Sequence, residues 1–238
     1  MPMWNPWFGC RKYSEGCRFC YIHKGDAKRG LNTNNIRKSS SLNAPLLKVN
    51  DQFKWKSGST VYLCFSSDFL IEEADLWRSE VWRIIKTRSD LNFVFLTKRI
   101  DRFNDIIPSD WGGGYDNVTV GCTVENQETA DYRLSIFNEL NIKHKNIICQ
   151  PMIGPINLEG YLEGVELVIV GGESDYNGRP LDYQWVLDIR EQCVKKNVGF
   201  QFRQCSTHFI KDGKSYTLST KELSKQAKKA AIDYERVI

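Results

Sequence analysis

The sequence predicts an α/β protein whose parallel sheet is buried on both faces. Short apolar, β-branched runs recur along the chain, segments with helical spacing of apolar residues separate them, and most runs are continuously apolar. Right-handed β–α crossovers would curl such a sheet into a partial, TIM-like barrel. An open doubly wound sheet is the alternative, because periodicity does not distinguish the two.

Strands and helices are expected to alternate along most of the chain. Six strands are predicted at residues 61–65, 92–97, 117–124, 146–150, 167–172 and 199–204. Helices are predicted at residues 72–86, 99–107, 126–140 and 182–195, with a short helical turn at 156–162. Pro108 ends the second of these helices. A short strand near residues 4–8 would raise the number of strands to seven.

We expect a single domain over residues 1–238, which is an ordinary length for one β/α unit. Residues 31–59 lack regular periodicity and are rich in Asn, Ser and Lys, so we expect an insertion that serves as a lid or substrate loop. Residues 207–238 hold a Lys-Asp-Gly-Lys turn and a basic helix at 221–231. They form the expected C-terminal basic extension.

Composition indicates a soluble globular protein, with 41% hydrophobic and 26% charged residues. There is no apolar run of about 18 residues and no basic-then-apolar N-terminus, so neither a membrane span nor a secretory signal is expected. Five of the eight cysteines are dispersed singly, unlike a secreted disulfide framework. We therefore expect a cytoplasmic protein. The net charge of +4 favours polyanions only slightly.

The stretch WNPWFGCRKYSEGCRFCYIH, residues 4–23, gathers Cys10, Cys17 and Cys20 in a C-x6-C-x2-C spacing. Thiolates this close in sequence bind soft metals. A [4Fe–4S] cluster usually takes four cysteines, so three would leave one iron open to a small molecule. Structural zinc is the rival, because His23 follows Cys20 by three positions and completes a Cys3His set.

The cysteine loop resembles that of the radical S-adenosylmethionine (SAM) enzymes. They hold a [4Fe–4S] cluster by three cysteines, with an aromatic residue just before the last, as Phe19 stands here before Cys20. The first gap of six residues departs from their commonest spacing of three. The chain also resembles a little-characterised family of phage and bacterial proteins with a three-cysteine motif. That resemblance covers roughly residues 4–205 through WNPWFGC, CRFCY, FLTKR, VGCTVENQ, PMIGPINL and VIVGGES.

Polar residues follow nearly every predicted strand, where ligands bind in parallel β/α proteins. They include Ser66, Ser67, Asp68, Lys98, Arg99, Glu125, Glu173, Arg203 and Gln204. Polar side chains at the ends of nearly all strands would form a ring, and such a ring could bind a large polar ligand. The alternative is that these residues are ordinary loop starts and helix caps.

The radical SAM resemblance implies roles for this ring at SAM. Ser66, Ser67 and Asp68 are expected to meet the amino group, with Asp68 supplying the negative charge. Lys98 or Arg99 is expected to pair with the carboxylate.

The same resemblance implies further contacts. Glu125 is expected to accept from the ribose hydroxyls, and the backbone around Phe19 to touch the adenine. Glu173 is expected to contact SAM or the substrate.

The resemblance implies an enzyme that takes one electron from a reductant and cleaves SAM reductively at the cluster. The resulting 5′-deoxyadenosyl radical would take a hydrogen from an unidentified substrate. Cys205 and Cys122 are candidate hydrogen donors, and the alternative is that they are small buried core residues.

Aromatic and basic residues interleave in and just after the cysteine loop, which favours a nucleic acid or nucleotide as substrate, ahead of a peptide. A loop that shields the cluster would show the same pattern. The non-enzymatic alternative is a zinc-clipped nucleic-acid-binding protein of a phage or mobile element.

Overall fold

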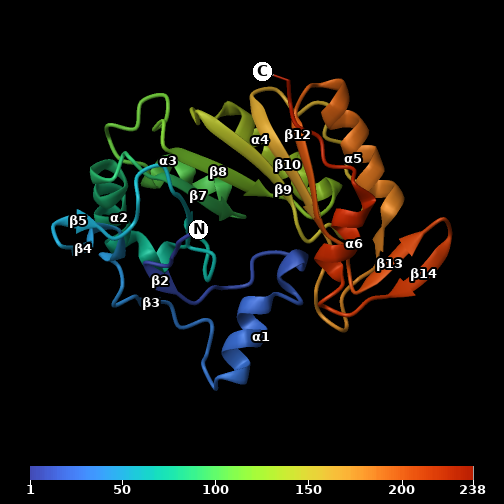
Figure 1. Cartoon of the computed structure of the whole chain (residues 1–238), viewed down its shortest axis with the longest axis horizontal. Helices are drawn as coiled ribbons and strands as arrows, with labels where there is room; N and C mark the ends of the chain where they lie inside the picture. Colours follow the sequence, from blue (N-terminus) through green and yellow to red (C-terminus); the bar gives the residue numbers. More distant parts are fainter. Residues whose placement is uncertain (238) are drawn as a thin grey trace. The chain divides into compact units, whose positions relative to one another are not determined.

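The computed structural model describes residues 1–237 and is organised by a seven-stranded parallel sheet (Figure 1). The order across the sheet is β1-β6-β7-β8-β9-β10-β12. These strands are β1 (Met3–Trp4), β6 (Thr60–Leu63), β7 (Asn92–Thr97), β8 (Val118–Thr123), β9 (His144–Cys149), β10 (Val165–Gly171) and β12 (Gly199–Gln204).

The strand order equals the chain order, and this decides between the two predicted architectures. A doubly wound sheet reverses direction at a switch point, whereas here every strand lies beside its predecessor. Because β1 and β12 form two edges, the sheet is an open, partial β/α arrangement. The prediction is confirmed at this level, as is the seventh strand at the N-terminus. Strands β7 and β12 have the predicted bounds, and the other four predicted strands end within two residues of theirs.

The helices between the strands also follow the predicted pattern. They are η3 (Glu72–Ala74) with α2 (Asp75–Thr87), η4 (Ile100–Arg102) with α3 (Phe103–Ile106), α4 (Gln127–Glu139) and α5 (Tyr183–Lys195). The predicted helical turn at 156–162 is wrong, since the residues there form turns and irregular chain. Pro155 precedes this segment, and the side chain of Asn157 accepts a hydrogen bond from the Glu159 N–H at 3.0 Å, which favours a turn over a helix.

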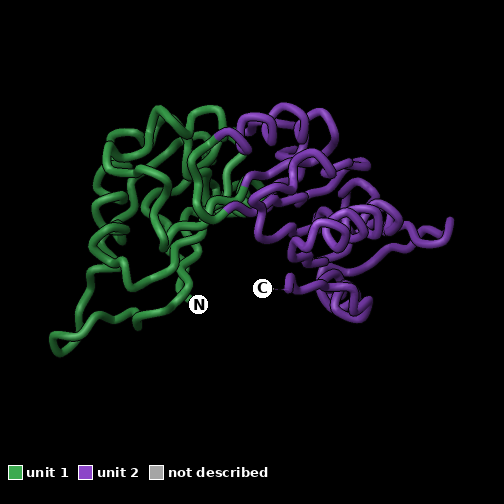
Figure 2. The backbone as a smooth tube through the Cα atoms, turned by 90° about the horizontal axis from the view of Figure 1, so that it is seen from above, with its two compact units in different colours: residues 1–11, 22–121, 140–144 green, residues 12–21, 122–139, 145–238 purple. Residues whose placement is uncertain are grey.

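The chain forms two compact units (Figure 2). Unit 1 comprises residues 1–11, 22–121 and 140–144. Unit 2 comprises residues 12–21, 122–139 and 145–238.

Aromatic side chains dominate the core of unit 1. Trp7 stacks on Phe69 with ring centroids 5.5 Å apart, and Phe69 lies 4.3 Å from Phe95. Trp82, on the buried face of α2, meets the Phe69 ring edge-on at 5.2 Å. These contacts fix α2 and the segment after β6 against the sheet.

The insertion predicted at 31–59 belongs to unit 1 and contains only short elements. They are β3 (Arg37–Lys38), which pairs with β2 (Trp7–Phe8), η2 (Ala44–Leu46), and the pair β4 (Lys48–Val49) and β5 (Gln52–Phe53). Arg88, which is fully buried, donates to the carbonyls of Pro45 and Trp55 and pairs with Asp90. One buried guanidinium therefore ties the insertion to the end of α2.

Unit 2 adds a second, three-stranded sheet to β10 and β12. It consists of β11 (Leu181–Asp182), β13 (His208–Lys211) and β14 (Lys214–Thr217). Phe209 of β13 packs on Phe202 of β12 and on Tyr183 of α5. The predicted basic helix is α6 (Leu223–Ala230), which packs against β12.

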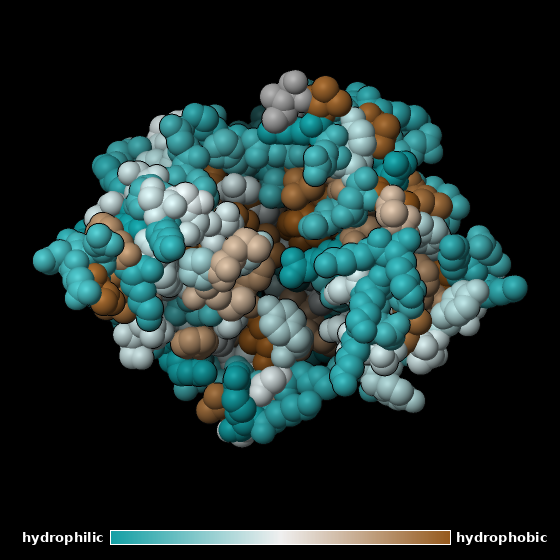
Figure 3. All heavy atoms as spheres, in the orientation of Figure 1, coloured by the Kyte–Doolittle hydropathy of each residue, from teal (hydrophilic) through white to brown (hydrophobic). Residues whose placement is uncertain are grey.

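On the face shown in Figure 3, hydrophilic residues cover most of the surface of each unit and hydrophobic ones show as separate patches. Among the helices of residues 1–237, none has the length and apolar character needed to cross a membrane.

Candidate functional site

The three cysteines of the N-terminal loop are divided between the units. Cys10 follows β2 and belongs to unit 1. Cys17 ends the short helix η1 (Glu15–Cys17), and Cys20 lies just before α1 (Tyr21–Lys28); both belong to unit 2. Each part of the loop is fixed by contacts within its own unit.

In unit 1, the backbone on the N-terminal side of Cys10 is tightly confined. Gly9 has a φ of +93°, and a Cβ there would lie 2.7 Å from the carbonyl oxygen of Asn35. The Cys10 N–H donates to the Thr33 carbonyl at 2.8 Å, and the Ser67 hydroxyl donates to the Gly9 carbonyl. The position before Cys10 therefore requires glycine.

Asp68, which follows β6, uses its carboxylate to organise unit 1. Its oxygens accept from the Thr97 hydroxyl at 2.8 Å, the Lys98 N–H at 3.0 Å and Arg99 Nη1 at 3.1 Å. The other terminal nitrogen of Arg99 donates to the Arg11 carbonyl at 3.0 Å. Since Asp68 and Arg99 are both buried, this pair anchors the residue that follows Cys10.

The other predicted residues of unit 1 lie beside this pair in the chain. Ser66 is half-buried, and its N–H donates to the side chain of Asn5 at 3.0 Å. Ser67 holds the Gly9 carbonyl, and Lys98 is half-buried at the end of β7. Ser67, Asp68 and Lys98 are thus brought together with the segment around Cys10, as expected from their positions at strand ends.

In unit 2, Glu125 is buried after β8 and binds the loop before Cys17. Its Oε1 accepts from the Ser14 hydroxyl at 2.7 Å, and its Oε2 accepts from Arg133 Nη1 at 2.9 Å. A Cβ on Gly16 would lie 2.6 Å from Oε1, so η1 sits directly against this carboxylate. Arg133 is equally buried and places its guanidinium 5.4 Å from the Tyr13 ring centroid.

A second carboxylate–arginine pair holds η1 after β10. Glu173 accepts from the backbone N–H of Arg179 at 2.6 Å and from its Nε at 3.0 Å. Arg179 Nη2 donates to the Glu15 carbonyl at 2.9 Å. The hydrogen bond that Arg179 donates to the Glu173 carboxylate raises the pKa of Arg179, so this guanidinium stays charged. The guanidinium groups of Arg18 and Arg179 both lie near the Phe19 ring, 5.3 and 5.7 Å from its centroid.

Comparison with protein families gives a match over residues 2–235 to the family described as “Protein of unknown function (DUF5131)”. The chain belongs to this family. Comparison with curated proteins and with solved structures gives no match.

Three residues that hold the loop of this DUF5131 chain were missed in the sequence: Ser14, Arg133 and Arg179. A signal existed for Arg133, because it occupies the same helical stripe as the buried residues Ala130, Leu134 and Phe137. A charge on an apolar stripe requires a buried partner of opposite sign. Ser14 and Arg179 lie in irregular segments, where no periodicity marks which side chains turn inward.

The candidate hydrogen donors Cys122 and Cys205 are both buried in unit 2. Cys122 lies within β8, and Cys205 directly follows β12. Burial raises the pKa of Cys205 to about 11, so this group is a neutral thiol near pH 7. A neutral S–H is the form that can donate hydrogen. A small core residue would be buried in the same way, so the burial of Cys122 and Cys205 fits both interpretations.

The donor chemistry of the loop fits a metal that prefers sulfur. The sulfur of Cys17 accepts a hydrogen bond from the Tyr13 N–H at 3.5 Å. Within residues 1–237, no three or more His, Cys, Asp and Glu side chains are already gathered as metal ligands. The fit to a cluster therefore rests on three thiols and their spacing in the chain. His23, the fourth ligand of the zinc alternative, lies in α1 within unit 1.

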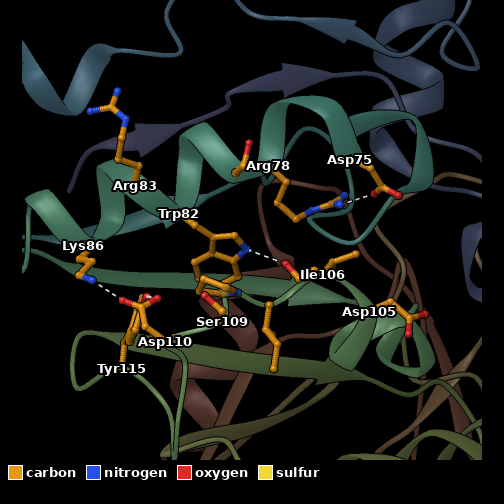
Figure 4. Close-up of a pocket in the computed structure, with 13 residues that line it drawn as sticks. Asp75, Arg78, Trp82, Arg83, Lys86, Asp105, Ile106, Ser109, Asp110 and Tyr115 are labelled. Carbon is orange, nitrogen blue, oxygen red and sulfur yellow. Dashed lines mark hydrogen bonds and ion pairs between the residues drawn. The ribbon is translucent and has the colours of Figure 1, made fainter.

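Unit 1 also has an open hollow of about 520 Å³ between α2 and residues 105–115 (Figure 4). Most of its polar groups are already paired. Lys86 and the Tyr115 hydroxyl both contact Asp110, and the indole N–H of Trp82 donates to the Ile106 carbonyl at 3.0 Å. The hollow presents no convergent set of reactive groups, so the loop and its anchors are the stronger candidate.

Proposed function

We propose that this chain is a radical SAM enzyme in which Cys10, Cys17 and Cys20 ligate a [4Fe–4S] cluster. One observation carries the proposal: carboxylate–arginine pairs, each with a buried carboxylate, follow three parallel strands and bind the cysteine loop. Asp68–Arg99 binds Arg11, Glu125–Arg133 binds Ser14, and Glu173–Arg179 binds Glu15. A loop with only a structural role does not need three ion pairs built on buried carboxylates, which are costly to desolvate.

When bound, such a cluster supplies one-electron chemistry that cleaves SAM. The protein's part is to hold the loop and to position groups around it. Each arginine neutralises the carboxylate beside it, so the pairs add little net charge near three thiolates.

The proposed SAM contacts follow from what each side chain already binds. Asp68 accepts four hydrogen bonds from its own unit, so we assign it to positioning Arg99 and the backbone at Lys98. Ser66 and Lys98 are half-buried and are assigned to the amino and carboxylate groups of SAM.

For the remaining contacts, Phe19, with two guanidinium groups near its ring, is assigned to the adenine. Glu125 and Glu173 act through Arg133 and Arg179 to hold the loop. Cys205, as a neutral thiol, is assigned as the hydrogen donor to a substrate radical, with Cys122 as the alternative donor. The proposed setting is the cytoplasm, where thiols stay reduced and a reductant is at hand.

The first test is metal content after anaerobic purification, compared across cysteine variants. We expect about four irons and about four sulfides per chain and a brown protein. Cys10→Ala, Cys17→Ala and Cys20→Ala should each lose most of the iron, whereas the control Cys193→Ala, on the buried face of α5, should keep it. One zinc per chain and no colour would overturn the proposal. Loss of that zinc in His23→Ala would then establish the Cys3His alternative.

A further inference from the structure

The positive charge of the chain is concentrated in a short stretch of unit 2. Residues 211–229, here called the basic segment, contain six lysines and two acidic residues, a net charge of +4. The whole chain of 238 residues also has a net charge of +4, so everything outside the segment is neutral on balance. The six lysines are Lys211, Lys214, Lys221, Lys225, Lys228 and Lys229.

The fold presents these lysines to solvent. In α6, Leu223 and Ala227 are buried against β12, whereas Lys225, Lys228 and Lys229 are exposed on the opposite side of the helix. The β13–β14 hairpin carries Lys211 and Lys214 around its turn, and both are exposed. Figure 3, in the orientation of Figure 1, shows hydrophilic residues over this part of unit 2.

Most of this charge has no counter-charge in the protein. Within the described part of the chain, Lys214, Lys221, Lys228 and Lys229 form no ion pair, and Lys225 has only a distant one to Glu222 at 3.7 Å. Lys228 and Lys229 complement the negative end of the helix dipole. The helix dipole accounts for neither Lys214 nor Lys221, which lie outside α6. It therefore does not explain the positive charge of the whole basic segment.

We propose that the basic segment binds the phosphate backbone of a single-stranded nucleic acid. Tyr216 on β14 is 45% exposed and stands two positions from Lys214, which offers a ring for base stacking beside a cation. An anionic membrane would also attract lysines, but interfacial helices need a free apolar face. The apolar face of α6 is already buried against β12. The inference rests on the proposed function only in treating the bound strand as the enzyme's substrate.

The test compares two triple variants with the same net charge. Lys225→Gln, Lys228→Gln and Lys229→Gln together remove charge from α6 while keeping residues that suit a helix. The control changes Lys48, Lys54 and Lys56 to Gln, three exposed lysines of unit 1. Each triple removes three positive charges, so both chains have a net charge of +1. Binding of a labelled oligonucleotide of about 20 nucleotides is measured by fluorescence anisotropy, from about 50 to 200 mM salt.

We expect the α6 triple to bind about tenfold more weakly at low salt, with the slope of log affinity against log salt reduced by about 2. The control should stay within about twofold of the natural chain. Equal loss in both triples, or no loss in either, would overturn the inference. Binding to vesicles rich in anionic lipid that depends on α6, without oligonucleotide binding, would overturn it in favour of a membrane.

The assay contains no SAM, so its outcome is separate from that of the proposed enzyme. A chain that binds through α6 and holds no iron contradicts the proposed function alone. A chain that holds the cluster but binds the oligonucleotide equally well in all three forms contradicts the basic segment alone.

Discussion

The hydroxyl of Ser14 donates a hydrogen bond of 2.7 Å to Oε1 of Glu125, although the two residues are 111 positions apart. The other oxygen of the same buried carboxylate accepts from Arg133. A side chain predicted to hold a cofactor is thus engaged by the loop that bears Cys17. The contact identifies Glu125 as a residue that positions the loop, and the two substitutions described next test that role.

Glu125→Gln should weaken both the fold and metal retention. The neutral amide leaves the buried Arg133 without its charge partner, which costs about 3 kcal/mol of unfolding free energy. Urea denaturation measures the first effect, and the iron content after gel filtration measures the second. Glu128→Gln, an exposed position in the first turn of α4, is the control and should change neither. Unchanged stability and iron content in Glu125→Gln would contradict the role assigned to the carboxylate.

Gly16→Ala should displace η1 from the Glu125 carboxylate. The added Cβ would lie 2.6 Å from Oε1 of a side chain that cannot move away, because Ser14 and Arg133 hold it. We expect a loss of about 1–3 kcal/mol in stability, as for other overpacked sites. Gly25→Ala is the matched control, since nothing lies within 4 Å of its Cβ and alanine favours α1. That control should be neutral or stabilised by up to about 1 kcal/mol.

Arg179→Lys should loosen the loop without removing a charge. A lysine cannot hold the Glu173 carboxylate and the Glu15 carbonyl together, as the planar guanidinium does. Hydrogen exchange of residues 15–20 should become about tenfold faster, while global stability falls by about 1–2 kcal/mol. Arg203→Lys, at an exposed position of β12, should leave both unchanged. If the amides of residues 15–20 exchange as slowly in the variant as in the natural chain, Arg179 does not hold the loop.

The ion pair between Arg88 and Asp90, which supports the anchor of the insertion, should be lost at low pH. The hydrogen bond from buried Arg88 lowers the pKa of Asp90 below its ordinary value of 3.8. Because the folded pKa lies below the unfolded one, the pair stabilises the fold above about pH 4, and this contribution disappears as the pH falls through the folded pKa. Asp90→Asn should therefore cost up to about 1 kcal/mol at pH 7, and the difference should shrink towards pH 3. A difference that stays constant with pH would show that the carboxylate's charge is not responsible.

Much of the fold could be predicted because local pattern determines it. The runs at 92–97 and 199–204 are apolar on buried positions and end at polar residues, so their bounds follow from the sequence alone. Strand order could not be predicted in the same way, because the periodicity allowed both a partial barrel and a doubly wound sheet until the observed order decided between them. The turn at 156–162 was misread, because apolar spacing there is outweighed by the turn chemistry of Asn157.

The candidate site was only partly predictable. The positions of Asp68, Glu125 and Glu173 at strand ends were visible, but their partners were not. Hydrogen bonds to these carboxylates join segments far apart in the chain, such as Ser14 with Glu125, and no local periodicity encodes such a contact. The sequence therefore indicated ligands for a cofactor at positions where the structure shows carboxylates already occupied by arginines.

The central claim is tested most directly by incubating the anaerobically purified chain with SAM and dithionite. The product to measure is 5′-deoxyadenosine, by chromatography and mass spectrometry, with Cys17→Ala as the control. We predict that it forms together with methionine in the natural chain and is absent in the variant. A chain that carries its full iron complement and yet yields no 5′-deoxyadenosine would contradict the claim, as would equal amounts from both chains.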